Sequence, residues 1–546
     1  MTRLHNPVIR GFAPDPSLIR VGDWYYVATS SFEWFPTIPI HRSRDLAHWE
    51  YAGHVRGAAP GGSLAGVPDS GGIWAPSLSW DGERFWVTYA IVRSVGTPYF
   101  DTDTYVSTAT DVDGMWSAPR RVASHGFDPA LFHEGGRLWL LNLQNDHRPG
   151  GRRFAGIVLT ELDRDTLSPV GGTHLLLQHE RLIEGPKVVR REGWYYLVLA
   201  EGGTGFEHGV RVARARELTG PYELDDRPLL TSRDDPSLPL QKAGHGELVR
   251  TPGGDWVLSH LTARPVSTPD GPRCPLGRET AIQAVTWDAE GWPRMRHGGP
   301  HPEVQVEIDV CDALDAVEER EAREAPTNSG GPLPQLPDQT DPLGWPWSSP
   351  RATPDSSWAD ATTRPGWIRL RGRHGPESRW AHSLLAQRVT EHRAEAEVTV
   401  EASPRTFTQA AGLMLWYSAE AYLALDLTWA EPEGEGQRGQ QWSGEGRTVL
   451  SLVAREESVT RQVAVVDVAS EGPLTLGVTV DGSDARFWYV RSGVRTPVGP
   501  PLDFTELSDD YGTKLRFTGS MAGIHAVDLV DAAFSADFTG FRLTCR

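Results

Sequence analysis

The chain has 546 residues and a mass of 60.1 kDa, which is more than one hydrophobic core normally supports, so two domains are expected. A net charge of −19 repels the phosphates of nucleic acids and the headgroups of anionic membranes, and it argues against binding to either. An uncharged partner or substrate fits this composition better.

Cysteine usage and local hydropathy indicate a reducing compartment. The three cysteines, Cys274, Cys311 and Cys545, are odd in number and widely scattered, so they predict neither a disulfide framework nor a metal site. The N-terminal stretch MTRLHNPVIRGFAPDP lacks the apolar region of a signal peptide, and no run approaches the roughly 18 apolar residues of a membrane-spanning helix. We therefore expect a cytoplasmic protein, and the sequence leaves open whether it is a monomer or a homo-oligomer.

The first half of the chain repeats one pattern five times. In each unit a short apolar strand, a turn of Gly, Asp or Glu and an aromatic strand follow one another, which is typical of a β-hairpin. The units are DPSLIRVGDWYYVATS from Asp15, APSLSWDGERFWVTYA from Ala75, DPALFHEGGRLWLLNLQ from Asp128, EGPKVVRREGWYYLVLA from Glu184 and HGELVRTPGGDWVLSH from His245. They begin 60, 53, 56 and 61 residues apart, a spacing that suits one four-stranded propeller blade per unit. Because hairpins alone are barely stable, we predict a closed five-bladed β-propeller over residues 1–305.

The segment that follows has the composition of a linker. Residues 306–346 are rich first in charge and then in Pro and Gly, and within them CDALDAVEEREAR could form a short helix. From residue 347 to residue 546 short alternating strands return, among them WIRLRG, HRAEAEVTV, AGLMLWYS, AYLALDLTW, TVLSLVAR, ARFWYVRS and GIHAVDLVD. Their spacing predicts a β-sandwich, so the expected fold is all-β throughout.

The opening residue of each hairpin unit has an equivalent place in the repeat. If this strand is the innermost one, five side chains face one another around the propeller axis: Asp15, Ala75, Asp128, Glu184 and His245. In this alignment Glu184 stands one residue out of step with the others. Proline follows most of these positions closely, and its fixed φ and missing N–H hold the preceding side chain in place at the start of a strand.

Three carboxyl groups that face one cavity suit acid and base chemistry. Mutual repulsion and burial raise their pKa values, so at least one of them is expected to hold a proton near neutral pH. Glycosidic cleavage uses such a pair, in which one carboxyl group protonates the leaving oxygen and the other acts on water or on the sugar. The alternative use of Asp15, Asp128, Glu184 and His245 is a Ca²⁺ cage. We therefore expect no required cofactor, and a structural or activating Ca²⁺ near the axis is the alternative.

Four further residues are candidates for contacts with a substrate. His245 in KAGHGELV is a core histidine, a bridge to a central ion or a substrate contact. Arg278 in CPLGRETAIQ lies beyond the fifth hairpin, where its position alone would suit a surface ion pair. Trp74 precedes Ala75 and is expected close to the pocket, and Phe32 in SSFEWFP follows the first hairpin, where a connecting loop could wall the pocket.

Seven stretches, in order along the propeller region, together resemble a known family. They are GFAPDPSLIRVGDWYYVATSSFEWFPTIPIHRSRDL, GGIWAPSLSWDGERFWVTYA, GFDPALFHEGGRLWL, IEGPKVVRREGWYYL, AEGGTGFEHGVRVARA, LLTSRDDPSLPLQKAGHGELV and CPLGRETAIQAVTW. The family is that of the β-xylosidases of glycoside hydrolase family 43. FTQAAGLMLWY and LSDDYGTKLRFTGSMAGIHAVDL resemble the lectin-like, concanavalin A-like β-sandwich at the C-terminus of the same enzymes. The resemblance implies a five-bladed propeller whose active-site mouth is closed by a loop of the sandwich.

The resemblance also implies roles for individual residues. Asp15 would be the general base that activates water, Glu184 the general acid, and Asp128 the residue that orients this acid and tunes its pKa. Arg278 would contact the sugar in the first subsite. The implied mechanism is inverting, for which the two working carboxyl groups lie roughly 6.5–9.5 Å apart.

The hydrophobic walls of the first subsite would be Phe32 and Trp74. The chain departs from the family pattern at two positions. Asn145 in QNDHRPG stands where the family commonly has Trp, and Met521 stands where the FTGAF-like stretch has an aromatic residue. The first departure bears on a pocket wall and the second on the lid, so both bear on the choice of sugar.

The sequence thus predicts an exo-acting β-xylosidase that releases xylose from the non-reducing end of xylo-oligosaccharides. Within the same chemistry, the alternative is an α-L-arabinofuranosidase or an enzyme with both activities. A retaining fructosidase on the same kind of propeller is a further alternative. From another class, the alternative is a carbohydrate-binding propeller without turnover, against which the three carboxyl groups argue.

Overall fold

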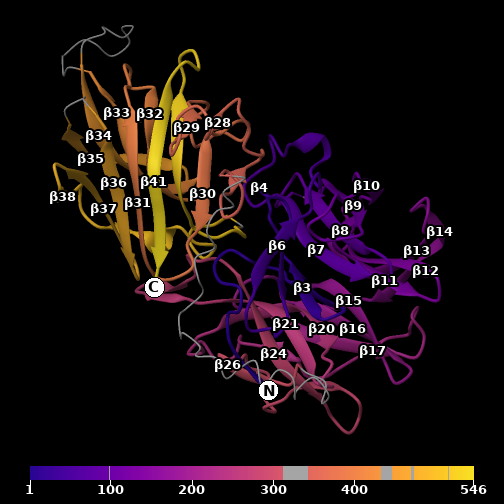
Figure 1. Ribbon diagram of the computed structural model, residues 1–546. Coiled ribbons are helices and arrows are strands. Elements are labelled where there is room, and N and C mark those ends of the chain that lie inside the picture. Colours follow the sequence, from indigo (N-terminus) through magenta and orange to yellow (C-terminus); the bar gives the residue numbers. More distant parts are fainter. Residues whose placement is uncertain (98, 311–341, 432–445, 469–471, 515) are drawn as a thin grey trace, which may run out of the picture.

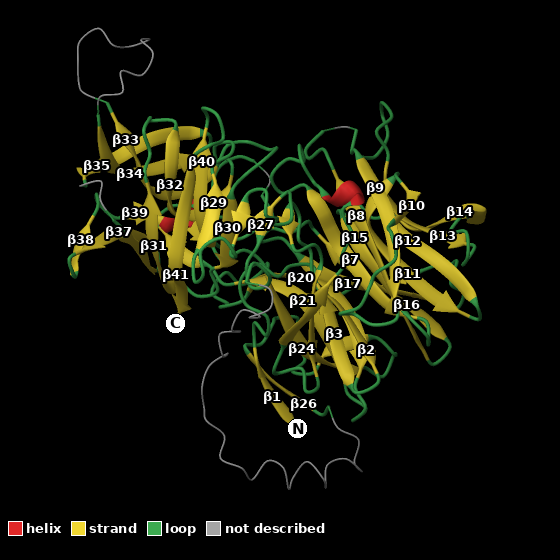
Figure 2. Ribbon diagram, turned by 45° about the horizontal axis from the view of Figure 1, so that its top comes forward, coloured by secondary structure: helices red, strands yellow, loops and turns green. Residues whose placement is uncertain are grey.

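The structure is a computed structural model that describes residues 1–546 except 98, 311–341, 432–445, 469–471 and 515. Two β-rich bodies lie side by side, the first coloured indigo to magenta and the second orange to yellow (Figure 1). Apart from two short 3-10 helices, η1 (Pro60–Gly62) and η2 (Phe504–Glu506), the described residues form strands and loops (Figure 2). The predicted all-β fold is confirmed.

Five sheets, one for each repeat unit, form the first body, and we call each sheet a blade. Blade one contains β2 (Ser17–Val21), β3 (Trp24–Ala28), β5 (Pro39–Ser43) and β6 (Glu50–His54). Blade two contains β7 (Gly72–Trp80), β8 (Phe85–Val92), β9 (Thr102–Ala109) and β10 (Arg120–Ala123). Blade three contains β11 (Gly126–Glu134), β12 (Arg137–Asn145), β13 (Phe154–Leu162) and β14 (Pro169–Leu177).

The last two blades carry small additions. Blade four contains β15 (Ile183–Arg191), β16 (Trp194–Glu201), β17 (Gly209–Ala215), β18 (Glu223–Leu224) and β19 (Leu230–Thr231). Blade five contains β20 (Gln241–Arg250), β21 (Trp256–Ala263), β24 (Glu279–Trp287) and β25 (Pro293–Met295), with the ribbon of β22 (Val266–Thr268) and β23 (Gly271–Arg273) inserted between β21 and β24. Each predicted hairpin forms the first two strands of its blade, so the five-bladed propeller is confirmed.

The N-terminal segment ties the first blade to the last. β1 (Thr2–His5) pairs antiparallel with β26 (Gln305–Ile308), and the N–H of Ala13 donates to the carbonyl of Arg278 at 2.9 Å. Because β26 belongs to this pair, ordered propeller structure continues past residue 305. Most of the predicted linker, including the stretch proposed as a short helix, falls in residues 311–341 and lies outside the described residues.

Two sheets packed face to face form the second body. The first contains β28 (Ala359–Asp360), β29 (Ile368–Arg371), β41 (Ser535–Cys545), β31 (Arg393–Ala402), β36 (Leu474–Asp481), β37 (Asp484–Arg491), β38 (Val494–Pro497) and β39 (Leu502–Asp503). The second contains β30 (Leu384–Arg388), β40 (Met521–Asp528), β32 (Gln409–Ser418), β33 (Ala421–Ala430), β34 (Arg447–Glu456) and β35 (Val459–Asp467). Alternate residues of β31, such as Val398 and Val400, are buried in one core with Leu413 and Leu423 of the other sheet. This is the predicted β-sandwich.

The two bodies share backbone contacts. β27 (Ser349–Pro350), which leads into the sandwich, pairs with β4 (Trp34–Phe35) of the propeller. A Cβ added to Gly519 would lie 2.5 Å from the carbonyl oxygen of Leu276, and one added to Gly277 would lie 2.6 Å from that of Thr518. Only glycine permits this approach, which brings Thr518 and Gly519 of the sandwich against the propeller.

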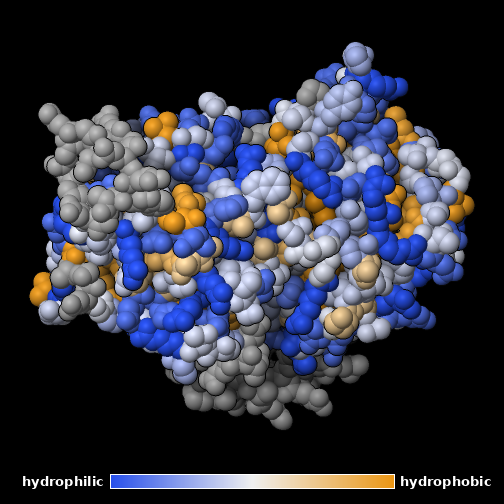
Figure 3. Space-filling model, turned by 90° about the horizontal axis from the view of Figure 1, so that it is seen from above, coloured by the Kyte–Doolittle hydropathy of each residue, from blue (hydrophilic) through white to orange (hydrophobic). Residues whose placement is uncertain are grey.

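Figure 3 shows one face of the molecule. On the face shown in Figure 3, hydrophilic side chains predominate and apolar ones lie scattered in small groups. Among the helices that the structure describes, none is long and apolar enough to cross a membrane.

Candidate active site

At an equivalent position in or just before its innermost strand, every blade has a residue in the left-handed backbone region. These residues are Asp15, Ala75, Asp128, Gly185 and His245, with φ of 53°, 38°, 52°, 58° and 50°. In blades two to five the pairing of the first two strands shifts register at the same point, which marks a β-bulge. Bulges of this kind redirect side chains, and strained residues are commonly found at functional sites. Equivalent positions of the five blades thus lie close together around the propeller axis.

The fourth blade explains why Glu184 is out of step in the sequence repeat. Here Gly185 adopts the left-handed conformation, and a Cβ on it would lie only 2.9 Å from the ring of His245. The carboxyl group of this blade therefore comes from the preceding residue, Glu184. The N–H of Gly185 donates to Oδ2 of Asp128 at 3.1 Å, which links the third and fourth blades beside Glu184.

A cavity of about 330 Å³ opens where these residues meet, a volume in the range of small-molecule sites. The structure brings together all seven residues that the sequence singled out, and each lines this cavity: Asp15, Phe32, Trp74, Asp128, Glu184, His245 and Arg278. Other lining residues include Phe100, Phe127, Phe154, Thr204, His208 and Phe517. Of the two departures from the family pattern, Asn145 ends β12 and Met521 is fully buried in β40, and neither is among the described lining residues.

Asp15 is held as a carboxylate. Its Oδ1 lies 3.0 Å from Nη1 of Arg278 and 3.9 Å from Nδ1 of His245, and its Oδ2 accepts a hydrogen bond from the hydroxyl of Ser30 at 2.6 Å. Burial by itself raises the pKa of Asp15, but the Arg278 guanidinium, His245 and the Ser30 hydroxyl together lower that pKa below its ordinary value. Asp15 is therefore ionised at neutral pH and can accept a proton.

Glu184, in contrast, is held as a protonated carboxyl group. Burial, and then the charges of Asp128 and Asp15, raise the pKa of Glu184 well above its ordinary value. Burial and the charge of Asp15 also raise the pKa of Asp128, although Lys187 and the N–H of Gly185 partly offset them. One cavity thus holds an ionised carboxylate and a carboxyl group that keeps its proton, which is the division of labour between base and acid.

Two buried histidines in the cavity are uncharged. Burial lowers the pKa of His245 to about 4 and that of His208 to about 3. His208 is wedged against Gly244, where a Cβ would lie 2.0 Å from the ring, and its Nδ1 lies 3.1 Å from the carbonyl oxygen of Glu201. Its Nε2 is buried and has no hydrogen-bond partner among the described residues. A polar atom left in this state at a cavity wall suits a hydroxyl group of a ligand.

Aromatic rings form one side of the cavity. The ring of Phe517 lies 5.9 Å from that of Phe32 and 5.2 Å from that of Trp74, between centroids. The guanidinium carbon of Arg278 lies 5.6 Å from the centroids of both Phe32 and Phe517. Phe517 belongs to the sandwich, so the second domain completes the wall. From the sequence, the stretch FTGSM, which begins at Phe517, was expected to belong to the lid, but Phe517 itself was not singled out.

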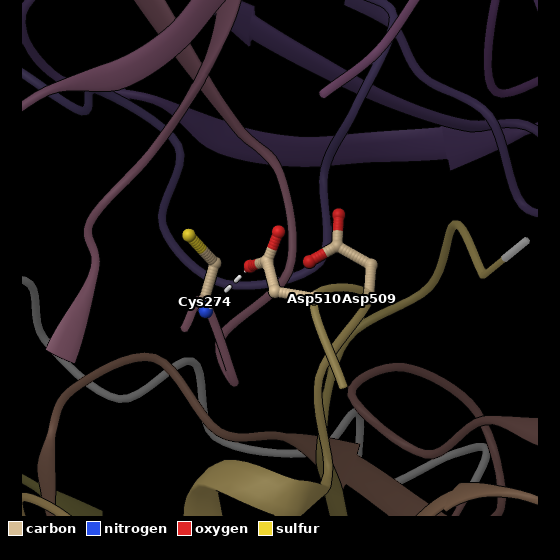
Figure 4. A group of neighbouring side chains, drawn as sticks. All are labelled: Cys274, Asp509 and Asp510. Carbon is tan, nitrogen blue, oxygen red and sulfur yellow. Dashed lines mark hydrogen bonds between the residues drawn. The ribbon is translucent and has the colours of Figure 1, made fainter. Parts of the chain in front are cut away.

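A second cluster of chemically active side chains lies between the domains. Figure 4 shows Cys274 of the propeller beside Asp509 and Asp510 of the sandwich, a spacing that could suit a metal ion. However, Nζ of Lys242 lies 2.9 Å from Oδ2 of Asp509 and 2.6 Å from Oδ1 of Asp510. Burial raises the pKa of the Cys274 thiol, so the thiol keeps its proton. The cluster is an ion pair that joins the domains, with an ammonium group as its cation.

Comparisons with known proteins agree with this geometry. Residues 4–293 match the model of the glycosyl hydrolases family 43, and residues 339–544 match that of the β-xylosidase C-terminal concanavalin A-like domain. The chain is 38% identical over 560 residues to xylosidase/arabinosidase 43B of Humicola insolens, which covers 99% of this chain and 97% of that protein. It is 33% identical over 557 residues to a β-xylosidase of Bacillus subtilis (strain 168), with 99% of both chains covered.

A solved structure supports the same assignment over both domains. The crystal structure of a xylan β-1,4-xylosidase from Bacillus halodurans C-125 superposes with a TM-score of 0.89 at 37% identity, and the match covers 99% of this chain and 100% of that one. Fold, sequence and the order of the two domains therefore agree, and the chain belongs to glycoside hydrolase family 43.

Proposed function

We propose that the protein is an exo-acting β-xylosidase that releases xylose from the non-reducing end of xylo-oligosaccharides. The observation that carries this proposal is the pair of carboxyl groups with opposite pKa shifts in one cavity, Asp15 lowered and Glu184 raised. The names of relatives that match nearly full length, xylosidase/arabinosidase and β-xylosidase, support the choice of sugar.

We propose a single-displacement mechanism. Glu184 donates its proton to the glycosidic oxygen while Asp15 removes a proton from the water that attacks the anomeric carbon. The bond from that carbon to the leaving oxygen breaks as the bond to water forms, so the released sugar has inverted configuration. Asp128 acts through its neighbours, because its hydrogen bond from Gly185 fixes the backbone beside Glu184 and its charge raises the pKa of the acid.

Recognition of the terminal sugar follows from the wall of the cavity. Arg278 and Nε2 of His208 offer polar contacts to sugar hydroxyls, and the rings of Phe32, Trp74 and Phe517 offer flat apolar faces. The cavity is small, and the sandwich contributes part of its wall. These features favour a chain end over the middle of a polysaccharide, which supports exo action.

We propose further that hydrolysis requires no cofactor. The protein's own carboxyl groups supply both the acid and the base. Among the described residues, no three ligand atoms of Asp15, Asp128, Glu184 and His245 lie within 4.8 Å of one another, which argues against a Ca²⁺ cage built from these side chains alone. Activity that survives EDTA and is unchanged by added Ca²⁺ is the expected result. Loss on EDTA treatment that Ca²⁺ restores would instead place an ion near His245.

For the compartment we propose the cytoplasm. Cys274 is buried and Cys545 half-buried, and both are free thiols, which suits a reducing environment. Fractionation of the source cells with activity assays checks this proposal, and activity mainly outside the cytoplasm would overturn it.

The second candidate is an α-L-arabinofuranosidase, alone or combined with xylosidase activity. It is favoured by the name of the Humicola insolens relative and by a 29% identical non-reducing end α-L-arabinofuranosidase of Bacteroides ovatus. We expect kcat/KM on 4-nitrophenyl β-xyloside to exceed that on the α-L-arabinofuranoside. The opposite order would make the arabinosidase the principal activity. NMR of the first product formed checks inversion, and a retained anomer would overturn the single-displacement mechanism.

Two substitutions test the assigned acid and base. Glu184→Gln removes the acid, so kcat on xylobiose should fall by about 10²–10⁴-fold, and by less on 4-nitrophenyl β-xyloside, whose leaving group needs little protonation. Asp15→Asn removes the base and should slow both substrates alike by a similar factor. Asp23→Asn, an exposed change in the first blade, is the control and should leave kcat unchanged. Wild-type rates in either active-site variant would refute the assignment.

A further inference from the structure

Ser70 does not line the cavity, but it accepts hydrogen bonds from two residues that do, Trp74 and Phe517. It is 2% exposed, has a left-handed φ of 61°, and stands just before β7. Its carbonyl oxygen accepts a hydrogen bond from Nε1 of Trp74 at 2.9 Å, and its hydroxyl oxygen accepts one from the N–H of Phe517 at 2.9 Å. One residue of the propeller thus contacts both the indole of Trp74 and the main chain of Phe517 in the sandwich.

The surroundings of Ser70 hold it firmly in place. Its own N–H donates to Oε2 of Glu33, which is 1% exposed, at 3.1 Å. The preceding residue, Asp69, accepts hydrogen bonds from Nη2 of Arg351 at 2.6 Å and from the N–H of Ala419 at 3.1 Å. Both of those donors belong to the second domain or lead into it. Asp69 therefore fixes the sandwich to the propeller. The adjacent residue, Ser70, is held in place by the same contacts and hydrogen-bonds to Trp74 and Phe517 in the cavity wall.

The propeller also holds Phe517 at its carbonyl group. Its carbonyl oxygen accepts a hydrogen bond from Nη2 of Arg278 at 3.0 Å, and Nη1 of the same guanidinium contacts Asp15. With Ser70 on its N–H and Arg278 on its carbonyl, Phe517 has little freedom to shift. Its ring stands at 81° to that of Trp74, 5.2 Å away between centroids.

We propose that Ser70 is a positioning residue whose hydroxyl sets the place of the Phe517 ring against Trp74, and so sets the width of the sugar pocket from outside it. The proposal rests on the proposed function insofar as the pocket binds the terminal sugar. A ring wall contacts the sugar both before and during reaction, so loosening it weakens binding in both states. Such a loss raises KM and leaves kcat nearly unchanged.

Ser70→Gly tests this role because it removes the hydroxyl, together with Cβ, and leaves the main chain. The main-chain bonds to Glu33 and Trp74 stay, and glycine adopts a φ of 61° without strain. One buried hydrogen bond is lost, so KM for 4-nitrophenyl β-xyloside should rise about three- to tenfold. The melting temperature should fall, because the N–H of Phe517 loses its partner, so the rise in KM is the result that distinguishes the proposal. Ser70→Ala, which keeps Cβ, provides a second variant with the same expected change in KM.

The matched control is Ser43→Gly. Ser43 is a buried serine at the end of β5, in blade one, whose hydroxyl oxygen accepts the N–H of Leu46 at 2.9 Å, away from the cavity. We expect this variant to lose stability without a change in KM. A purely structural role for Ser70 would give the same pattern, a lower melting temperature or active fraction at the wild-type KM.

A double-mutant cycle shows whether Ser70 acts through Phe517. In a Phe517→Ala background the ring is absent, so adding Ser70→Gly should produce no further rise in KM. A wild-type KM in a folded Ser70→Gly protein, a further rise in the double mutant, or loss of the fold in both Ser70 variants would each overturn the proposal. If the wild type cleaves no β-xyloside, the proposed function fails separately, and the same cycle is measured on whichever nitrophenyl glycoside it hydrolyses.

Discussion

Asp15 and Glu184 carry the same functional group in the same cavity, and their surroundings make them differ. Asp15 contacts a guanidinium and a hydroxyl, which stabilise its negative charge. Glu184 has burial and two neighbouring carboxyl groups, all of which disfavour its charge. The pH range in which the enzyme is active should therefore lie between two pKa values. The lower one is that of Asp15, which is below its ordinary value, and the upper one is that of Glu184, which is above its ordinary value.

The pH profile of kcat/KM should be bell-shaped, and Asp128 should control its alkaline side. As pH falls through the pKa of Asp15 the base becomes protonated, and as pH rises through that of Glu184 the acid loses its proton. Asp128→Asn removes a charge that raises the pKa of Glu184, so the alkaline limb should move to lower pH. Profiles of the variant and of the exposed Asp23→Asn control measure this shift. An alkaline limb that stays in place would show that Asp128 does not tune the acid.

The repeat identified the carboxyl groups, the family resemblance pointed to Phe32, Trp74 and Arg278, and neither identified His208 or Phe517. Asp15, Asp128 and Glu184 could be found because each opens a hairpin unit of the same pattern. His208 and Phe517 could not, because they reach the cavity from segments without any repeat, and only the folded chain brings them there. Buried atoms left without partners, such as Nε2 of His208, become visible only once the neighbouring residues are placed.

Among the strands, the bulges of blades two to five connect the repeat with the chemistry. Four blades place a side chain on the left-handed residue itself, and the fourth blade uses Gly185 so that His245 can pack against it. The hairpins were predictable because each combines a short apolar strand, a clear turn of Gly, Asp or Glu and an aromatic strand. Outer strands such as β14 and β35 were missed, since both are largely exposed and lack a buried face that would produce a pattern.

Gly185→Ala should damage this arrangement more than left-handed strain alone explains. A non-glycine residue at such a φ costs roughly 1–2 kcal/mol, and here the new Cβ would also meet the His245 ring at 2.9 Å. Gly22→Ala is the matched control, because Gly22 has a φ of 59° and no atom within 4 Å of the added Cβ. Urea unfolding and kcat/KM of both variants measure the difference. Equal losses in stability and normal activity in Gly185→Ala would contradict the predicted contact.

The two domains behave as one enzyme because their joint is also part of the cavity. Lys242 is 1% exposed and is paired across the interface with Asp509 and Asp510. These two aspartates precede Phe517 in the sequence of the sandwich. The sequence predicted both folds and the presence of a lid, since each depends on patterns within one segment. It could not predict this ion pair, whose partners lie far apart along the chain.

Lys242→Met should weaken the docking of the domains strongly. The change leaves two buried carboxylates without their cation, and breaking a buried pair in this way typically costs about 3–5 kcal/mol. Lys514→Met is the control, since Lys514 is 55% exposed and pairs with Glu420 on the surface, where such a pair contributes about 0.2–1 kcal/mol. Denaturant unfolding of the full chain, followed by activity, measures both. Similar midpoints for the two variants would show that the buried pair contributes little.

The short pairing of β4 with β27 has a consequence for how such enzymes can be altered. Because this pairing and the ring of Phe517 fix a wall of the propeller's pocket, the sandwich cannot be treated as an interchangeable appendage. A chimera that exchanges the sandwich between two relatives would exchange part of the sugar-binding surface with it. Libraries for new sugar preferences should therefore vary both halves of the gene together, since a substitution selected in one half depends on the sequence of the other.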